Sequence, residues 1–315
     1  MKTVTGPFLE HLQTSAPRFW RTRQLLDSGV GHEGIRWLHR TGHLQRLRRG
    51  CYYPRAAWEQ RRPWEQDTLR ILAHAHVAVQ ASPGRYAYSH ATAARLRGWA
   101  VLHAEPRIHV TSSTRPGQGQ HAPDVVAHTA PLPADQTEVV SGVVVTSACR
   151  TAVDCARSLT FSGGMVVMDQ ALRSGVRHQE VRDAARQLVG HRGVVQLRRV
   201  LDGADARSES PGESCTRVAI ARMNIEQPTP QLAVWTTRGI RRLDFGWEQE
   251  KLALEFDGSS KYFDFKPTDQ ALVEERQREK LLMEHGWSFI RISWRDLQNE
   301  SALKQRILAG LRRNR

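Results

Sequence analysis

A single carboxylate lies inside an apolar run near the C-terminal end of the sequence. Glu255 follows Leu252-Ala253-Leu254 and precedes Phe256, and another largely apolar run, GIRRLDFGW, comes before it across the polar turn Glu248-Gln249-Glu250. Two such runs joined by so short a segment predict a β-hairpin. An unpaired carboxylate in a buried strand costs several kcal/mol in desolvation. Glu255 must therefore be protonated, paired or bound to a metal ion.

The residues around this hairpin predict an α/β domain over 213–315. ESCTRVAIARMN predicts a helix, QLAVWT a strand, TDQALVEERQREKLLMEHG a helix that ends at Gly286, WSFIRISW a strand, and the residues from about 299 a last helix. The expected order is α-β-β-β-α-β-α.

Acidic residues gather on the predicted hairpin. Asp244 lies on its first strand and Glu255 on its second, and Asp257 faces the same side as Glu255 if the strand continues that far. Carboxylates at adjoining strand ends suit Mg²⁺ or Mn²⁺, which can generate hydroxide from water. Lys261 follows closely, and a Lys can hold the attacking water or stabilise charge on a phosphorane.

These residues, together with Arg278, Gly286-Trp287 and Arg291, resemble the very-short-patch-repair-like endonuclease domains of bacteria, often labelled DUF559, in the PD-(D/E)xK superfamily. The resemblance implies a restriction-endonuclease-like αβββαβ core. In that core Asp244 and Glu255 bind the metal, and Glu213, with Glu209 as its rival, adds a carboxylate from the first helix.

The sequence departs from the superfamily where a Glu-x-Lys is usual, because it reads Glu255-Phe256-Asp257. Three alternatives follow: Lys261 stands in from a shifted position, Asp257 makes the site more acidic, or the site no longer cleaves. Arg278 and Arg291 either position phosphate or form structural ion pairs. A purely structural alternative has Asp244 capping a strand and Glu255 paired with Arg291.

The first 80 residues predict a small DNA-binding module. An apolar helix ends at Ser28-Gly29, a second helix over 33–40 ends at Gly42, and HLQRLRRGCYYP reads as a short hairpin around Gly50. This order predicts a winged helix-turn-helix. The alternative is a basic module that binds protein or merely packs. The basic residues expected on its DNA-facing helix and wing are Arg36, Arg40, Arg46, Arg48 and Arg49.

Residues 81–200 predict a mixed α/β domain, and residues 201–212 a polar linker. VVSGVVVTS is interpreted as one buried strand. His90, Asp154 and Asp169 have no partner at motif spacing and are interpreted as structural. The helix-turn-helix, YSHATAARLRGW and TSACRTAVDCAR resemble the antitoxin proteins of the AbiE type IV toxin–antitoxin class. That resemblance implies binding to DNA and a cognate toxin.

The net charge of +14 is unevenly spread. Residues 1–80 carry 13 Lys and Arg against 6 Asp and Glu, whereas residues 201–315 carry 19 against 18. A basic front supports nucleic-acid binding, although the general preference of this sequence for Arg contributes to it. The four scattered cysteines indicate neither a zinc site nor a disulfide framework.

No membrane span or signal peptide is expected, so we predict a cytoplasmic protein. The leading hypothesis from the sequence is a Mg²⁺-dependent endonuclease that cleaves double-stranded DNA, is targeted by the N-terminal winged helix and defends against foreign DNA. The alternative is a non-catalytic, antitoxin-like DNA-binding transcriptional regulator. A third, weaker interpretation directs the nuclease to RNA or to a branched or mismatched duplex.

Overall fold

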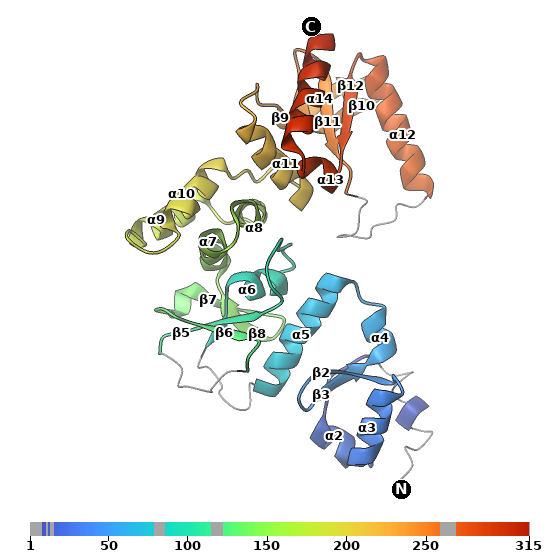
Figure 1. Cartoon of the computed structure of the whole chain (residues 1–315), viewed down its shortest axis with the longest axis vertical. Helices are drawn as coiled ribbons and strands as arrows, with labels where there is room; N and C mark the ends of the chain where they lie inside the picture. Colours follow the sequence, from blue (N-terminus) through green and yellow to red (C-terminus); the bar gives the residue numbers. More distant parts are fainter. Residues whose placement is uncertain are drawn as a thin grey trace. The chain divides into compact units, whose positions relative to one another are not determined.

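The computed structural model describes residues 8–10, 12, 16–78, 86–114, 122–258 and 269–314 (Figure 1). The chain divides into two compact units: Met1–Trp99 with Glu105–Ser147, and Ala100–Ala104 with Ala148–Arg315. Both contain helices and sheets, which confirms the α/β class. The boundary at Ser147 differs from the predicted boundaries at 80 and 200, which stay predictions.

The first unit begins with helices packed on a small sheet. The elements are β1 (Trp20–Arg21), α2 (Thr22–Asp27), α3 (His32–Arg40), β2 (Leu44–Arg48) and β3 (Cys51–Pro54), and the strand order is β1-β3-β2. Gly29 ends α2 with a φ of +83°, a conformation that glycine adopts without strain. Leu25, Ile35 and Leu38 fill the core between the helices and the sheet. Two helices follow, α4 (Arg55–Glu59) and α5 (Pro63–Ala78).

A five-stranded mixed sheet completes the first unit, in the order β6-β5-β4-β8-β7. Its strands are β4 (Ala87–Tyr88), β5 (Ile108–Ser112), β6 (Val125–Thr129), β7 (Thr137–Val140) and β8 (Val143–Thr146), with α6 (His90–Leu96) between β4 and β5 and the 3₁₀ turn η1 (Ala134–Gln136) before β7. Interpreting VVSGVVVTS as one strand is wrong: it forms the β7–β8 hairpin. Ser141 and Gly142 have φ values of +51° and +76°, and two consecutive positive φ angles reverse the chain.

The second unit begins with four helices, α7 (Ala148–Ser158), α8 (Phe161–Arg173), α9 (His178–Gln187) and α10 (Val194–Gly203). The predicted linker over 201–212 is too long. Leu201 is buried within α10, and Pro211 already begins α11 (Pro211–Arg222), so the connection spans only residues 204–210.

The remainder of the second unit follows the predicted element order, with one extra short helix. After α11 come β9 (Thr229–Thr236), β10 (Gly239–Trp247), β11 (Leu252–Phe256), α12 (Asp269–Glu284), β12 (Ser288–Ile292), α13 (Trp294–Leu297) and α14 (Glu300–Arg313). The sheet order is β12-β11-β10-β9, and only the β11–β12 pair is parallel. Phe245, Leu254 and Ile307 form its core.

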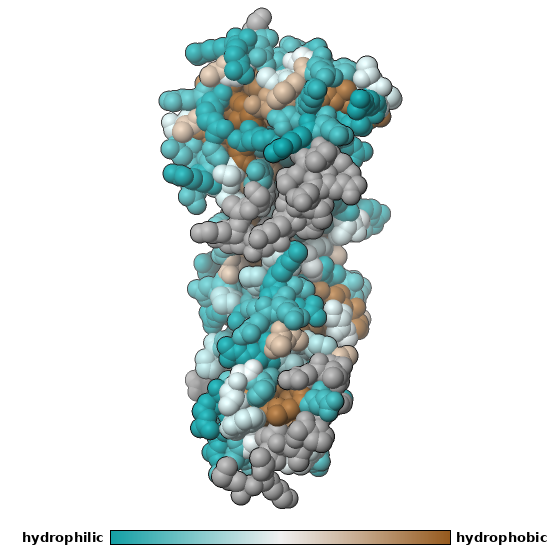
Figure 2. Space-filling model, turned by 90° about the vertical axis from the view of Figure 1, so that its right-hand side faces the viewer, coloured by the Kyte–Doolittle hydropathy of each residue, from teal (hydrophilic) through white to brown (hydrophobic). Residues whose placement is uncertain are grey.

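The surface is mainly polar on the face displayed in Figure 2, where hydrophobic residues occupy smaller, separate areas. Within the described ranges we find no helix that combines the length and the apolar character needed to span a membrane.

Candidate functional site

The β10–β11 hairpin brings Asp244 and Glu255 together. Phe245 pairs with Leu254, so Asp244 and Glu255 lie opposite each other one residue farther along the two strands. The backbone N–H of Phe256 donates a hydrogen bond of 2.9 Å to Oδ2 of Asp244. The two carboxylates therefore share one end of the hairpin, as the sequence predicted.

Glu213 lies near this pair, whereas its rival Glu209 points to solvent. Ser210 caps α11 and places Glu213 in the first turn, where it is 6% exposed. Oε2 of Glu213 accepts hydrogen bonds of 2.9 Å from the backbone N–H of Glu209 and from Nε2 of Gln231. The Glu209 carboxylate is exposed and lies 4.0 Å from Arg242.

Asp244 is the carboxylate whose protonation this arrangement changes. Burial, together with the negative charges of Glu255 and Glu213, raises the pKa of Asp244 to about 7, while the Phe256 N–H and the Arg278 charge partly oppose the change. Asp244 therefore exchanges its proton near neutral pH.

Glu255 is paired, but with Arg278 rather than with Arg291. Nη2 of Arg278 lies 2.9 Å from Oε2 of Glu255, and Nη2 of Arg291 lies 2.8 Å from Oε2 of Glu279. Glu255 and Arg291 are register partners across β11 and β12. Strand pairing alone therefore does not decide which charged side chains form an ion pair. Of the two roles open to Arg278 and Arg291, positioning phosphate or forming structural ion pairs, the structure shows the ion pairs.

Two further predicted residues, Asp257 and Lys261, are not shown to join this centre. Asp257 is exposed just after β11, and Lys261 lies outside the described residues. In the part of the chain that the structure describes, Asp244, Glu255 and Glu213 do not form a group of three with all ligand atoms within 4.8 Å; His90, His109 and His128 do. From the sequence, His90 was interpreted as structural, and neither His109 nor His128 carried a motif that singled it out.

The acidic residues interpreted as structural in the helices are paired. Asp154 lies 2.9 Å from Nε of Arg150. Asp169 is fully buried and pairs with Arg217, which joins α8 to α11.

The N-terminal arginines fall into two groups. Ile35 and Leu38 fix the inner side of α3, so Arg36 and Arg40 lie exposed on the outside, one helical turn apart. Arg46 and Arg49 are also exposed, on the β2–β3 ribbon. In contrast, Arg48 makes a two-pronged ion pair with Asp124, at 2.7 and 2.9 Å, and its side chain is only 15% exposed. Arg48 therefore stabilises the first unit.

Comparison with known proteins places a family resemblance in the middle of the chain. Residues 86–203 match the family model of the AbiEi antitoxin C-terminal domain. Two relatives from Mycobacterium tuberculosis, the uncharacterized proteins MT2308 (strain CDC 1551 / Oshkosh) and Rv2248 (strain H37Rv), are each 31% identical over 179 residues. This stretch is 56% of the chain and 65% of either relative, so the chain spans less than two thirds of their length.

Among solved structures, the crystal structure of the RV2827C protein from Mycobacterium tuberculosis is similar at 16% sequence identity and a TM-score of 0.38. The similarity covers 72% of this chain and 87% of that one.

These matches correct the leading hypothesis from the sequence. The expected DNA endonuclease function is wrong, because the family match is to an antitoxin domain and neither it nor the mycobacterial relatives support a nuclease. The antitoxin-like part of the resemblance is supported and the endonuclease part is not. The expectations of bound Mg²⁺ or Mn²⁺ and of an enzymatic activity stay predictions.

Proposed function

We propose that this chain is an antitoxin-like transcriptional regulator that binds double-stranded DNA and counteracts the cognate toxin of a type IV toxin–antitoxin system. The match of residues 86–203 to the AbiEi antitoxin C-terminal domain carries this proposal. That segment includes all five strands of the β6-β5-β4-β8-β7 sheet and the helices α6 to α10.

The N-terminal elements support the DNA-binding half of the proposal. The order α2, turn, α3 and β2–β3 ribbon is compatible with a winged helix-turn-helix, in which the second helix enters the major groove. Arg36 and Arg40 are exposed on that helix, and Arg46 and Arg49 on the ribbon. Guanidinium groups in these places suit base edges on the helix and phosphates on the wing.

A gel-shift titration on the DNA upstream of the protein's own gene tests this half. We expect Arg36→Ala combined with Arg40→Ala to weaken binding roughly tenfold or more. Arg182→Ala combined with Arg186→Ala is the matched control, because these arginines are also exposed and one turn apart, on α9 of the other unit. Equal binding by the two double variants would show that α3 does not contact DNA.

Co-expression tests the antitoxin half. A nucleotidyltransferase-like toxin encoded beside this gene should arrest growth when produced alone, and the full chain should restore growth. The Arg36→Ala, Arg40→Ala variant, expressed from an unrelated promoter, separates neutralisation from repression. If growth arrest persists although the folded chain is abundant, the antitoxin half of the proposal is wrong. The gel shift then still tests DNA binding by itself.

A further inference from the structure

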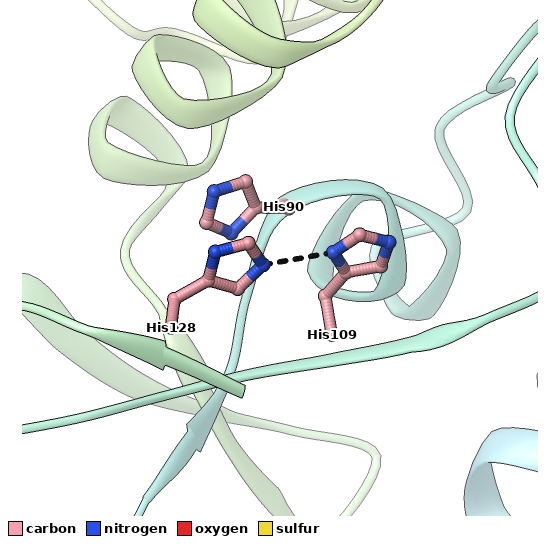
Figure 3. A group of neighbouring side chains, drawn as sticks. All are labelled: His90, His109 and His128. Atoms are coloured by element: carbon pink, nitrogen blue, oxygen red, sulfur yellow. Dashed lines mark hydrogen bonds between the residues drawn. The ribbon is translucent and has the colours of Figure 1, made fainter. Parts of the chain in front are cut away.

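Three histidines converge at one edge of the five-stranded sheet (Figure 3). His109 lies on β5 and His128 on the edge strand β6, while His90 directly follows Ser89 at the end of β4. Thr111 pairs with His128 across β5 and β6, and residues 109 and 111 share a face of their strand. The sheet therefore places His109 and His128 on the same face as diagonal neighbours.

The rings are close enough to share one small ligand. Nδ1 of His109 lies 2.9 Å from Nε2 of His128, and one ligand nitrogen from each of the three residues lies within 4.8 Å of the others. The His90 ring stacks on that of His128, with centroids 3.8 Å apart and planes 15° apart. All three side chains are half-buried.

We propose that His90, His109 and His128 bind a transition-metal dication, Zn²⁺ by its chemistry, with a fourth position open to water or to a group from a partner. Three imidazoles are a ligand set that Zn²⁺, Co²⁺, Ni²⁺ and Cu²⁺ accept. Zn–N bonds of about 2.0–2.1 Å in a tetrahedron separate the nitrogens by about 3.3 Å. The His109 and His128 nitrogens need to open only slightly, while the His90 ring must turn out of its stack.

The surroundings support the metal-binding form of these rings. A metal binds neutral imidazole. Burial, together with the charges of His128, Arg95 and Arg107, lowers the pKa of His109 to about 4, and burial lowers the pKa of His128. The two arginines also oppose a bound cation, and Asp67, 3.9 Å from Nε of Arg95, offsets part of that charge.

Ser89 gives the third ligand, His90, a buried hydrogen-bond partner. Oγ of Ser89 lies 2.9 Å from Nδ1 of His90, and Oγ1 of Thr111 donates to Oγ of Ser89 at 2.8 Å. Both hydroxyl residues are fully buried. With Nδ1 bonded to a hydroxyl, Nε2 is the nitrogen left for the ion once the ring turns, and a second group orients metal-binding imidazoles in the same way. His90 has a φ of +52°, a strained conformation for a non-glycine residue that is often kept at ligand sites.

Titration of the metal-stripped full chain with Co²⁺ tests the site, because tetrahedral Co²⁺ absorbs visible light, and competition with Zn²⁺ then gives the Zn²⁺ affinity. We expect saturation at one ion per chain. His128→Gln should weaken binding by more than the roughly 10- to 100-fold that the loss of an outer partner costs. His191→Gln is the control, because His191 is exposed and lies in the other unit.

A readout on the unaltered chain guards against a variant that fails to fold. Of the 14 histidines, three should show large imidazole ¹⁵N shifts on addition of Zn²⁺. Saturation unchanged in His128→Gln, no binding by the wild type below millimolar Zn²⁺, or ¹⁵N shifts in other histidines would each overturn the proposal.

Discussion

Asp244 occupies the position that the sequence predicts, but its surroundings disfavour the charged form of its carboxylate. It lies opposite Glu255, near Glu213, and Arg278, the cation whose charge opposes theirs, is already paired with Glu255. The pKa of Asp244 consequently rises from 3.8 to about 7. Between about pH 4 and pH 7 the folded state keeps a proton that the unfolded state has released. The unfolded state then binds fewer protons, so the stability of this unit falls as pH rises through that window.

Asp244→Asn should remove this dependence, because the amide carries no charge and its oxygen still accepts from the Phe256 N–H. We measure the free energy of unfolding in urea at pH 5, 6, 7 and 8. From pH 5 to pH 8, the free energy of unfolding of the variant should rise by roughly 1–3 kcal/mol relative to that of the wild type. Asp257→Asn removes the same charge from an exposed position and should follow the wild-type curve. Parallel curves for Asp244→Asn and the wild type would contradict the assigned cause.

Binding of Mg²⁺ by these carboxylates stays a prediction. A divalent cation would lower the pKa of Asp244 by favouring its charged form. The pH-dependent loss of stability should then shrink in millimolar Mg²⁺ for the wild type and stay unchanged for Asp244→Asn, which the same urea titrations would measure.

At the scale of the element, α11 is held between α8 and the hairpin strand β11. On one side Arg217 pairs with Asp169 of α8. On the other, Gly212 lies against Phe256 so closely that a Cβ atom there would stand 2.0 Å from the ring. The first turn of α11, which carries Glu213, is therefore positioned by a contact that only glycine allows.

Gly212→Ala should destabilise the second unit. Alanine gains up to about 1 kcal/mol in helix propensity, but overpacking against an aromatic ring costs roughly 1–3 kcal/mol, so the clash decides the sign. Gly258→Ala, where no atom of the described residues lies within 4 Å of the added carbon, should change the free energy of unfolding by less than about 0.5 kcal/mol. Chemical unfolding of the two variants makes the comparison, and equal stability would mean that Phe256 simply moves aside.

At the scale of the whole molecule, charge is distributed in a way that suits a polyanion. The first 80 residues hold a clear excess of basic residues, whereas residues 201–315 are almost balanced. Many arginines of the balanced part pair with acids of their own unit, as Arg278 and Arg291 do. Affinity for DNA should therefore depend on the front of the chain.

The salt dependence of DNA binding measures this. Each phosphate contact contributes about 0.9 to the slope of log K against log salt concentration. We expect Arg46→Ala and Arg49→Ala each to reduce the slope by about 1, and Arg48→Ala to lower stability instead, because Arg48 is bound to Asp124. A slope unchanged by Arg46→Ala and Arg49→Ala together would rule out the ribbon as a phosphate contact.

The helices and strands were largely predictable, and particular pairings were not. Gly29, Gly42 and Gly50 were interpreted correctly as ends and turns, because their positive φ angles satisfy a local need. The β7–β8 turn was missed although Gly142 marks it with the same kind of positive φ, because the valines on both sides of Ser141-Gly142 were interpreted as one continuous strand. The structural alternative for Glu255 named Arg291 as its partner, but Arg278, which reaches it from α12, forms the ion pair.

The sequence by itself determined the order of elements in 213–315, the hairpin that joins Asp244 to Glu255, and the basic character of the front. The elements and the hairpin depend on periodicity and turn residues, which act over a few neighbouring residues. The basic character is the sum of the charges of the residues. Only the tertiary structure decided that Arg48 binds Asp124 and that His90, His109 and His128 meet. Those contacts join separate elements of one sheet or unit, and their partners depend on strand order and packing, which no local pattern encodes.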